Sequence, residues 1–340
     1  MSATDESSPP SALHERACEA LQHWELSGDQ SPTLLKYREN AVFRVELADG
    51  TPAALRLHRP GYHSEGALLS ELHWMDDLRR NGLRVPEPIP STDGRLLVRL
   101  EASPRFGIQH ADIIGWVDGE QLGETGTPLT FGPEEISRVF TALGATMAEM
   151  HNISDRWGPP ATFSRPSWDL DGLLGEKPQW GRFWVCPGLE PGEIIRLEAL
   201  RTFLQDRLRD AAEQNLDYGL IHADLVRENV FIAGDGIAFI DFDDCGYGWR
   251  LFDLATTLLK NRREPLYPLI RNSLIKGYRS RRPLADSAVD LLPLFLLLRS
   301  LTYIGWVGER PEINDARERM RRYVPEALEL ARSLGFSEPA

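Results

Sequence analysis

Three oxygen-bearing side chains, Asp224, Asn229 and Asp241, flank two short apolar runs, Val230–Ile232 and Ile237–Ile240. The runs have the composition of strands and are separated by a Gly-Asp-Gly turn, so they predict a hairpin. Strand pairing would bring the segment before the first run close to the segment after the second. We therefore expect the three side chains to converge from loops on a rigid base, where functional groups commonly lie.

Side chains of these types suit phosphate chemistry. Asn and Asp oxygens are hard ligands for Mg²⁺, which takes one or two carboxylates together with substrate phosphates, and a further carboxylate could accept the proton of an attacking hydroxyl. The pattern His222-x-Asp224-x4-Asn229, followed by Asp241 between apolar residues, is the layout of kinase catalytic and metal loops. Taken singly, Asp224 could instead cap a turn, and His222 could be a structural residue.

The stretch from Leu220 to Asp244 resembles the aminoglycoside phosphotransferase and choline kinase group of kinase-fold enzymes, whose motif runs His-Gly-Asp-x4-Asn and then Ile-Asp-Phe. The resemblance implies that Asp224 is the catalytic base and that His222 braces its loop. Arg227, in the same loop, is assigned to the catalytic residues with them.

The resemblance also implies ATP as the nucleotide and a Mg²⁺ site held by Asn229 and Asp241. Asp243 could join this metal site or remain a solvated turn residue, and Asp244 is open to the same two interpretations. Further along, Asp253 suits the first turn of a helix. In the resembled group this residue steadies the catalytic loop.

Composition narrows the class of protein. The chain has 340 residues, of which 42% are apolar, so it can bury a sizeable core, and its length predicts two lobes or domains. Its net charge of −13 disfavours a general nucleic-acid binder.

Cysteine usage and hydropathy bear on the compartment. The three cysteines lie far apart without a CxxC pair, which fits a reducing cytosol and excludes a disulfide scaffold or a cysteine zinc site. Residues 1–6 are polar and acidic, so no signal peptide is expected. The longest apolar run, Leu291–Leu298, is too short to span a bilayer and contains Pro293. We therefore expect a cytoplasmic protein without a membrane partner.

The N-terminal part predicts a flexible tail at residues 1–11 and a small β-rich nucleotide-binding lobe at residues 12–114. Strand alternation in Ala53–Arg59 places Ala54 and Arg56 on one face. This resembles the kinase strand Val-Ala-Ile-Lys, whose small residue meets the nucleotide base and whose cation meets the phosphates. Arg replaces Lys here and can bind phosphate through two donors; a solvated strand Arg is the alternative.

Residues Glu65–Arg80 predict a helix with an apolar stripe. In kinases a glutamate of this helix pairs with the strand cation, so we expect Glu71 to pair with Arg56. The alternative is an exposed Glu71, as is usual for helical glutamates.

The segment Ala111–Val117 predicts the last strand of the N-terminal lobe, and residues 115–340 are expected to form a helical lobe with the catalytic loop and acceptor site. In the resembled group the backbone of this hinge meets the adenine. Ile114, Trp116 and Val117 are therefore assigned to nucleotide binding.

The pattern beyond the hinge predicts helices at Pro133–His151, Glu193–Ala212, Leu266–Tyr278, Leu291–Trp306 and Pro325–Leu334. Arg299, Tyr303 and Trp306 follow at i, i+4 and i+7 and share one helix face. They could line the acceptor site or form a buried aromatic seam. The aromatic insertion containing Trp168 and Asp169 could wall an acceptor pocket or simply pack on the lobe.

Protein kinases carry a Lys two residues after the catalytic Asp and a long activation segment ending in Ala-Pro-Glu. Val226 occupies that Lys position here, and only eleven residues separate Asp241 from Asp253. This favours a small-molecule alcohol as acceptor.

Three further pieces resemble the type II homoserine kinase and bacterial stress-response kinase relatives within the same group: Glu39-Asn40, Leu55–Pro60 and Arg299-x3-Tyr303-x2-Trp306. Glu39 and Asn40 are accordingly assigned to nucleotide binding, in a loop without the usual glycines. The stress-response relative is regarded as a protein kinase, so a Ser/Thr protein kinase remains an alternative function.

The charge of the C-terminal quarter bears on the acceptor. From Arg250 onward the chain has 16 Lys and Arg and 11 Asp and Glu, a net charge of +5. A pocket for a polycationic aminoglycoside is expected to be acidic, whereas Arg299 could grip a carboxylate.

We therefore predict an α+β, bilobal, protein-kinase-like fold that transfers the ATP γ-phosphate, with Mg²⁺, to a hydroxyl of a small molecule such as a hydroxy amino acid. The alternatives are an aminoglycoside phosphotransferase, the protein kinase above, and a nucleotide-binding sensor without turnover.

Overall fold

The computed structural model describes residues 10–28, 30–37, 40–213, 216–234, 236–310 and 315–339. The chain divides into two compact units. Unit 1 comprises residues 1–119, 157–165 and 238–243, and unit 2 comprises residues 120–156, 166–237 and 244–340. The predicted α+β class, β-rich in the N-terminal part and helical after it, is confirmed. The domain boundaries expected at residues 11 and 114 stay predictions, and residues 1–9 of the expected tail lie outside the described residues.

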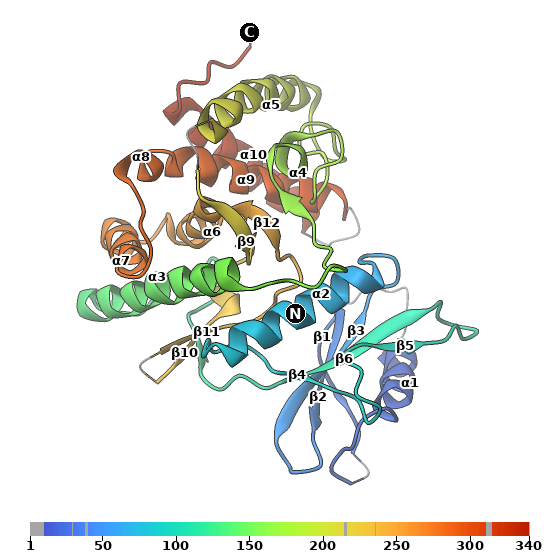
Figure 1. Ribbon diagram of the computed structural model, residues 1–340. Coiled ribbons are helices and arrows are strands. Elements are labelled where there is room, and N and C mark those ends of the chain that lie inside the picture. Colours follow the sequence, from blue (N-terminus) through green and yellow to red (C-terminus); the bar gives the residue numbers. More distant parts are fainter. Residues whose placement is uncertain are drawn as a thin grey trace. The chain divides into compact units, whose positions relative to one another are not determined.

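Unit 1 is built on one antiparallel sheet (Figure 1). Its elements are α1 (Pro10–Leu21), β1 (Thr33–Tyr37), β2 (Asn40–Glu46), β3 (Pro52–His58), α2 (Glu65–Arg80), β4 (Pro88–Ile89), β5 (Val98–Leu100) and β6 (Gln109–Gly115). The strand order is β1-β2-β3-β6-β4, with β5 also paired to β6. β3 is therefore a central strand, and its residues from Ala53 to His58 are all buried.

Alternation along β3 divides its side chains between two environments. Leu55 and Leu57 belong to an apolar core cluster with Leu13, Ala17 and other residues of α1. The opposite face of the strand carries Arg56, whose partners are described below.

Helix α2 has the bounds that the sequence predicts, Glu65 to Arg80. The Ser64 side chain caps it by accepting the Ala67 N–H, with Glu65 in the first turn and Arg79 in the last, as the helix dipole favours.

Unit 2 contains most of the helices and the loop that the sequence predicts to be catalytic. Its elements are β7 (Glu120–Gln121), α3 (Pro133–Arg156), β8 (Ser167–Trp168), α4 (Leu170–Leu174), α5 (Pro191–Ala212), β9 (Tyr218–Ile221), the 3₁₀ turn η1 (Arg227–Asn229), β10 (Val230–Ala233), β11 (Gly236–Phe239), β12 (Gly246–Trp249), α6 (Arg250–Asn261), α7 (Tyr267–Arg279), α8 (Asp286–Val289), α9 (Leu292–Gly308) and α10 (Ala316–Ser333). The predicted hairpin is confirmed as β10 and β11, which form a sheet with β7. The boundary between the units falls within β11.

Some elements differ from the prediction in their bounds; helix α3, for example, ends at Arg156 rather than His151. Helix α10 begins at Ala316 rather than Pro325, which lies inside it. The residues before the proline are mostly charged and show no clear apolar pattern, so the sequence did not predict these turns as helix. In the structure Met320 and Val324 are buried, and their packing stabilises the first turns of α10. The sequence also predicts a strand at residues 95–98 after the Asp93-Gly94 turn, whereas the observed strand β5 is Val98–Leu100.

Helices α3 and α7 approach closely because each has a glycine at the contact. A Cβ added to Gly144 of α3 would lie 2.0 Å from the carbonyl oxygen of Leu274, and one added to Gly277 of α7 would lie 2.0 Å from that of Thr141. Both positions therefore exclude a larger residue.

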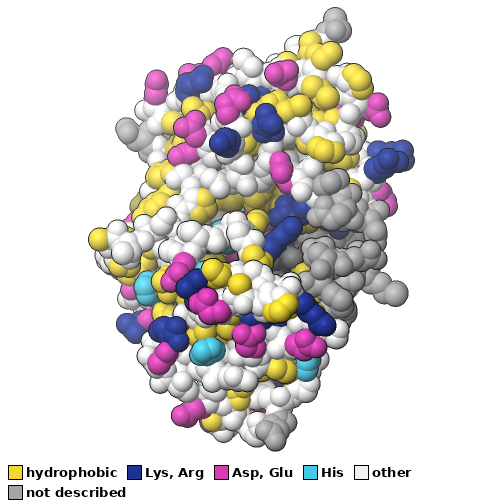
Figure 2. Space-filling view, turned by 90° about the vertical axis from the view of Figure 1, so that its right-hand side faces the viewer, with side chains coloured by type: hydrophobic (Ala, Val, Ile, Leu, Met, Phe, Trp, Pro, Cys, Tyr) yellow, Lys and Arg dark blue, Asp and Glu magenta, His cyan; other side chains and the backbone are white. Residues whose placement is uncertain are grey.

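Among the described residues, one helical segment, Asp286–Gly308, is long and apolar enough to cross a membrane, and 78% of its most apolar stretch is buried within the protein. Its helix α9 packs against α6 and α10. We therefore interpret it as a core helix of unit 2. On the face shown in Figure 2, acidic and basic side chains of the described residues are interspersed.

Candidate active site

The loop between β9 and η1 is held in place by hydrogen bonds to Asp253, which lies in the first turn of α6. The Asp253 carboxylate accepts the backbone N–H of His222 at 3.0 Å and that of Ala223 at 2.7 Å. The expectation that Asp253 steadies this loop is confirmed. Ala223 has a left-handed φ of 66°, so the loop is held in a conformation that costs a non-glycine residue about 1–2 kcal/mol.

His151 of α3, which sequence reasoning missed, supports Asp253 in turn. Its Nε2 lies 3.1 Å from Asp253 Oδ2, and its Nδ1 lies 2.8 Å from the hydroxyl of Tyr278. Burial, and then the nearby charge of Arg250, lower the pKa of His151 to about 4. A neutral imidazole therefore stands behind the loop at neutral pH.

Asp224 lies at the tip of the loop, and both of its carboxylate oxygens have a partner. Oδ1 accepts an N–H of Arg299, and Oδ2 accepts the Asn229 Nδ2 at 3.0 Å. Its backbone N–H donates to Nδ1 of the buried His222 at 3.3 Å. The Asp224 side chain is 21% exposed. The carboxylate is thus oriented from two sides and still open to solvent.

Arg227 and Asn229 lie in the 3₁₀ turn that follows. The guanidinium of Arg227 is buried and bonds to Glu264 at 2.5 Å, Asn261 at 2.9 Å and the Thr127 carbonyl at 2.6 Å. These contacts anchor the loop to surrounding elements, and the catalytic role assigned to Arg227 stays a prediction. Because Nδ2 of Asn229 bonds to Asp224, its Oδ1 is the atom available to a metal ion.

Arg299 and Tyr303 meet on α9, while Trp306 faces elsewhere. The Arg299 Nη2 lies 3.0 Å from the Tyr303 hydroxyl. Trp306 instead stacks with Arg310, whose Cζ lies 4.5 Å from its ring centre. The acceptor roles of all three residues stay predictions, although the Arg299 side chain is 0% exposed.

Lys260 of α6 is a further member of this cluster that sequence reasoning missed. Its Nζ lies 3.5 Å from the ring centre of Tyr303. Burial, and then the charge of Arg299, lower the pKa of Lys260 to about 7. The sequence around Lys260 does not predict this position, because the residues that surround its side chain come from α9.

The aromatic insertion is packed rather than open. Trp168 is buried, stacks on Phe252 with ring centres 5.4 Å apart, and donates to the Asp244 carbonyl at 2.9 Å. Asp169 caps α4 by accepting the Gly172 N–H at 2.9 Å. Both stay acceptor candidates by prediction only, since these contacts are structural.

Unit 1 holds a buried ionic cluster around Arg56. Its Nε and Nη2 donate to the two oxygens of Asp112 at 2.8 and 2.9 Å, and its Nη1 donates to Glu71 at 2.7 Å. The expected pairing of Arg56 with Glu71 is confirmed, and both alternatives, a solvated Arg56 and an exposed Glu71, are wrong. The nucleotide-binding role of the pair stays a prediction.

Asp112 on β6 is a partner that sequence reasoning missed, and it also lies 2.6 Å from His58 Nε2. Burial would raise its pKa, but the charges of Arg56 and then His58 outweigh burial and lower it to about 2. The register Arg56↔Asp112 between β3 and β6 creates the contact. The only sign of this partner in the sequence is that Asp112 is an acidic residue within a mainly apolar strand.

The residues assigned to the base of the nucleotide lie along the same strands. Ala54 pairs in register with Ile114, and both are buried. Trp116 is exposed, with the guanidinium of Arg44 5.2 Å from its ring centre, and Val117 is half-buried. Their roles in nucleotide binding stay predictions.

Asp243 is buried in unit 1 among polar partners. Its Oδ1 lies 3.4 Å from Asn40 Nδ2 and 3.6 Å from His63 Nε2, and its carbonyl accepts an N–H of Arg165. The interpretation of Asp243 as a solvated turn residue is therefore wrong. Glu39 lies outside the described residues.

Asp241 has a left-handed φ of 65°, and its carboxylate is 39% exposed. Lys36 is a cation close to this carboxylate, with its Nζ 3.8 Å from Asp241 Oδ2. Within the described part of the chain, no group of three or more His, Cys, Asp or Glu side chains could hold a metal by itself. A Mg²⁺ ion that shares its ligands with substrate phosphates does not require such a group, so the donor types fit.

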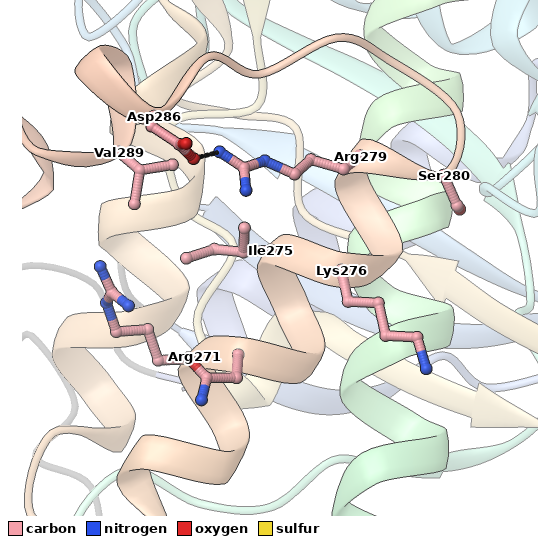
Figure 3. A pocket seen from close by; sticks show the side chains of 8 residues that line it. Arg271, Ile275, Lys276, Arg279, Ser280, Asp286 and Val289 are labelled. Carbon is pink, nitrogen blue, oxygen red and sulfur yellow. Dashed lines mark hydrogen bonds and ion pairs between the residues drawn. The ribbon is translucent and has the colours of Figure 1, made fainter.

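A hollow of about 620 Å³ lies along α7 and α8 of unit 2 (Figure 3). Its charged lining residues are Arg271, Lys276, Arg279 and Asp286. The single acid of the lining is bound by Arg279 at 2.5 Å. The hollow contains none of the residues assigned above, and it offers no carboxylate free to take a proton.

Comparison with known proteins gives consistent matches. The model of the phosphotransferase enzyme family matches residues 34–286. A homoserine kinase from Rhizobium johnstonii is 29% identical over 284 residues, covering 80% of this chain and 79% of the relative.

Two solved structures share the fold over nearly the whole chain. A microcompartment-associated aminopropanol kinase is 31% identical, with a TM-score of 0.80, and the match covers 94% of this chain and 97% of that one. The amicoumacin kinase hAmiN, in complex with AMP-PNP, Ca²⁺ and Ami, is 21% identical, with a TM-score of 0.75 and coverage of 95% and 94%.

Proposed function

The chain belongs to the phosphotransferase enzyme family, with the kinase-like fold predicted from its sequence, and we propose that it transfers the γ-phosphate of ATP to the hydroxyl of a small hydroxy amino acid. As a member of this family it is a kinase-type phosphotransferase that acts on small molecules with an alcohol group. None of its three cysteines forms a disulfide, which suits the cytosol, where we propose that the protein acts.

The observation that carries the proposal is the way in which the Asp224 carboxylate is held by hydrogen bonds to two other side chains. A carboxylate held on one oxygen by Arg299 and on the other by Asn229, yet 21% exposed, can accept the proton of an acceptor hydroxyl and fix its direction. Positioning and charge stabilisation supply most of the rate enhancement in phosphoryl transfer. We therefore assign Asp224 as the catalytic base.

Arg56 is assigned to the phosphates of the nucleotide. Three of its five N–H groups bond to Asp112 and Glu71, so two remain for phosphate oxygens. The two carboxylates fix the plane of the guanidinium, which a flexible lysine would not allow to the same degree. Ala54 and the backbone of residues 114–117 are assigned to the adenine.

Asn229 and Asp241 are assigned as Mg²⁺ ligands, with Asp243 as a further candidate. The available Oδ1 of Asn229 and the exposed carboxylate of Asp241 are both hard oxygens. When bound, Mg²⁺ would neutralise phosphate charge and orient the γ-phosphate. Support for a divalent cation comes from the amicoumacin kinase, which was solved with AMP-PNP and Ca²⁺.

A hydroxy amino acid is favoured as acceptor by charge and by relatives. The quarter of the chain from Arg250 onward has a net charge of +5, which opposes a polycation and tolerates a carboxylate. The name of the homoserine kinase indicates a hydroxy amino acid as its substrate. The name of the aminopropanol kinase indicates an amino alcohol, which lacks the carboxylate.

The test is a panel of acceptors with ATP and Mg²⁺, in which ADP release is measured. The panel contains homoserine, aminopropanol, kanamycin and a Ser/Thr peptide. We expect the largest stimulation by homoserine or a related hydroxy amino acid. Stimulation by kanamycin or by the peptide alone would overturn the acceptor class, while stimulation by aminopropanol alone would remove the carboxylate from it.

The base assignment is tested by Asp224→Asn, which keeps the size of the side chain. We expect kcat to fall by about 10²–10⁴-fold, as for loss of a general base, with ATP affinity nearly unchanged in titration calorimetry. Asp206→Asn, an exposed acid of α5, is the matched control. More than about a tenth of wild-type kcat in Asp224→Asn would show that Asp224 is not the base.

A further inference from the structure

Arg299 is a fully buried cation in the apolar helix α9. Its side chain is 0% exposed, and its neighbours Leu298, Ser300 and Leu301 are buried as well. A buried charge is costly unless it is paired and hydrogen-bonded. The contacts that compensate Arg299 therefore indicate why the chain keeps an arginine at this position.

Aromatic rings enclose the guanidinium. The Arg299 Cζ lies 4.4 Å from the ring centre of Trp180, 4.6 Å from that of Tyr303 and 5.6 Å from that of Phe252. Cations are attracted to the faces of such rings, most strongly where water is excluded. These three residues, which we call the aromatic cage, leave the guanidinium little freedom to rotate.

The donors of the caged guanidinium are directed at Asp224. Nη2 donates to Asp224 Oδ1 and to the Tyr303 hydroxyl, and Nη1 lies 3.5 Å from Thr302 Oγ1. Because its side chain is 0% exposed, Arg299 is placed to act through Asp224 rather than directly from solvent. Its one contact with the reaction is the Asp224 carboxylate.

Trp180 ties the cage to a second acid. Its Nε1 donates to Asp244 Oδ1 at 2.9 Å, and its ring centre lies 5.7 Å from that of Trp168. The aromatic insertion predicted as a pocket wall is thus packed behind Arg299. A substitution in this insertion would therefore affect the position of Asp224 through the Arg299 guanidinium.

We propose that Arg299, held by the aromatic cage, is the positioning residue of Asp224. With Asn229 on the other oxygen, it sets the angle at which the carboxylate meets the acceptor hydroxyl. This inference rests on the proposed function, because it takes Asp224 as the base. Displacement of a reacting group by about 1 Å can cost on the order of 10²-fold in rate, so the angle matters.

The test compares Arg299→Met, which removes the donors but keeps much of the apolar stem, with Arg299→Lys, which keeps the charge. Arg201→Met is the matched control, because Arg201 also stacks on a tryptophan, with its Cζ 3.8 Å from the Trp184 ring centre, and also pairs with an acid, Glu176, at 2.7 Å.

We expect Arg299→Met to lower kcat by about 10–100-fold and to change the KM for ATP by less than about twofold. Arg299→Lys should recover part of kcat, and Arg201→Met should match the wild type. In the Asp224→Asn background Arg299→Met should have almost no further effect on kcat, because residues that act as a unit are not additive. A purely structural role would lower kcat in both backgrounds alike.

Two results would overturn the proposal: Arg299→Met keeping half of wild-type kcat, or losing the same factor again in the Asp224→Asn background. If the wild type releases no ADP with any acceptor, the proposed function fails, and the pairing is judged by thermal unfolding instead. A double variant whose Tm change departs from the sum of the single changes by about 1 °C or more supports the pairing. Additive changes overturn it.

Discussion

At the scale of single residues, backbone conformation singles out two positions of the candidate site. Among the described residues, only Ala223 and Asp241 combine a side chain with a positive φ, at 66° and 65°. Residues in such conformations cost of order 1–3 kcal/mol and tend to cluster at functional sites. One of the two precedes the proposed base, and the other is a proposed metal ligand.

The left-handed backbone of Asp241 suggests a substitution that removes the charge of the side chain without disturbing the backbone conformation. Asparagine adopts a left-handed φ at least as readily as aspartate, so Asp241→Asn should fold normally. We expect it to weaken Mg²⁺-dependent nucleotide binding by about tenfold or more, since a neutral amide is a poorer ligand for a hard dication. Titration calorimetry with and without Mg²⁺ measures this. Unchanged Mg²⁺ dependence would transfer the metal site to Asp243.

The sequence was sufficient for the residues of the catalytic loop, because their types and spacing lie within one short stretch. It did not reveal several pairs of side chains in and around the candidate site, because the two members of each pair come from distant parts of the chain. Three such pairs are Arg56–Asp112, His151–Asp253 and Arg299–Asp224. Each depends on strand register or helix packing, so no local pattern could predict it.

At the scale of elements, α3 and α6 meet in the pair of His151 and Asp253. The pKa of His151 is lowered to about 4 in the folded protein by burial and then by Arg250, whereas an unfolded histidine titrates near 6.5. Between these pH values the unfolded chain binds the proton and the folded one does not. The linkage relation then requires stability to fall as the pH falls from about 6.5 to 4.

His151→Gln should remove this dependence. The wild type is expected to lose about 2 kcal/mol of unfolding free energy through His151 between pH 7.5 and pH 5, a loss that glutamine cannot show. Urea unfolding at several pH values measures both proteins. The stability difference between them should shrink as the pH falls, and curves that stay parallel would contradict a neutral buried His151.

The contact of α3 with α7 makes a second prediction at this scale. Gly144→Ala would place a Cβ 2.0 Å from the backbone oxygen of Leu274, and we expect a loss of about 3 kcal/mol or more, at the upper end for overpacking. Gly66→Ala in α2 is the control, because nothing lies within 4 Å of its Cβ. It should stabilise by about 0.4–1 kcal/mol. Chemical denaturation compares the two, and a Gly144→Ala variant as stable as the wild type would refute the close approach.

Sequence patterns located most elements, and their failures have physical causes. Helix α2 was predicted to the residue from its apolar stripe, and the structure adds a Ser64 cap and charges that follow the helix dipole, which fix its ends. Helix α10 was predicted too short because a proline usually begins a helix. The turns before Pro325 persist because Met320 and Val324 are buried, and burial is decided by packing rather than by local propensity.

At the scale of the whole molecule, charge is unevenly distributed along the chain. The total is −13, yet the quarter from Arg250 onward is +5. Within that quarter several cations are already paired, such as Arg250 with Asp155 and Arg262 with Glu329. The remaining field is therefore a property of the region rather than of one residue, and it acts on charged ligands at a distance that salt can screen.

This field predicts how ionic strength changes the use of acceptors, if the acceptor binds in the basic quarter. Homoserine is a zwitterion without net charge, so its KM should change by less than about twofold between 0.05 and 0.5 M salt, over which the Debye length falls from about 14 to 4 Å. Kanamycin is polycationic, and any weak turnover of it should improve with salt, because screening relieves its repulsion. Initial rates of ADP release at several salt concentrations measure both. A KM for kanamycin that instead rises with salt would reveal an acidic acceptor pocket and would favour an antibiotic as the substrate.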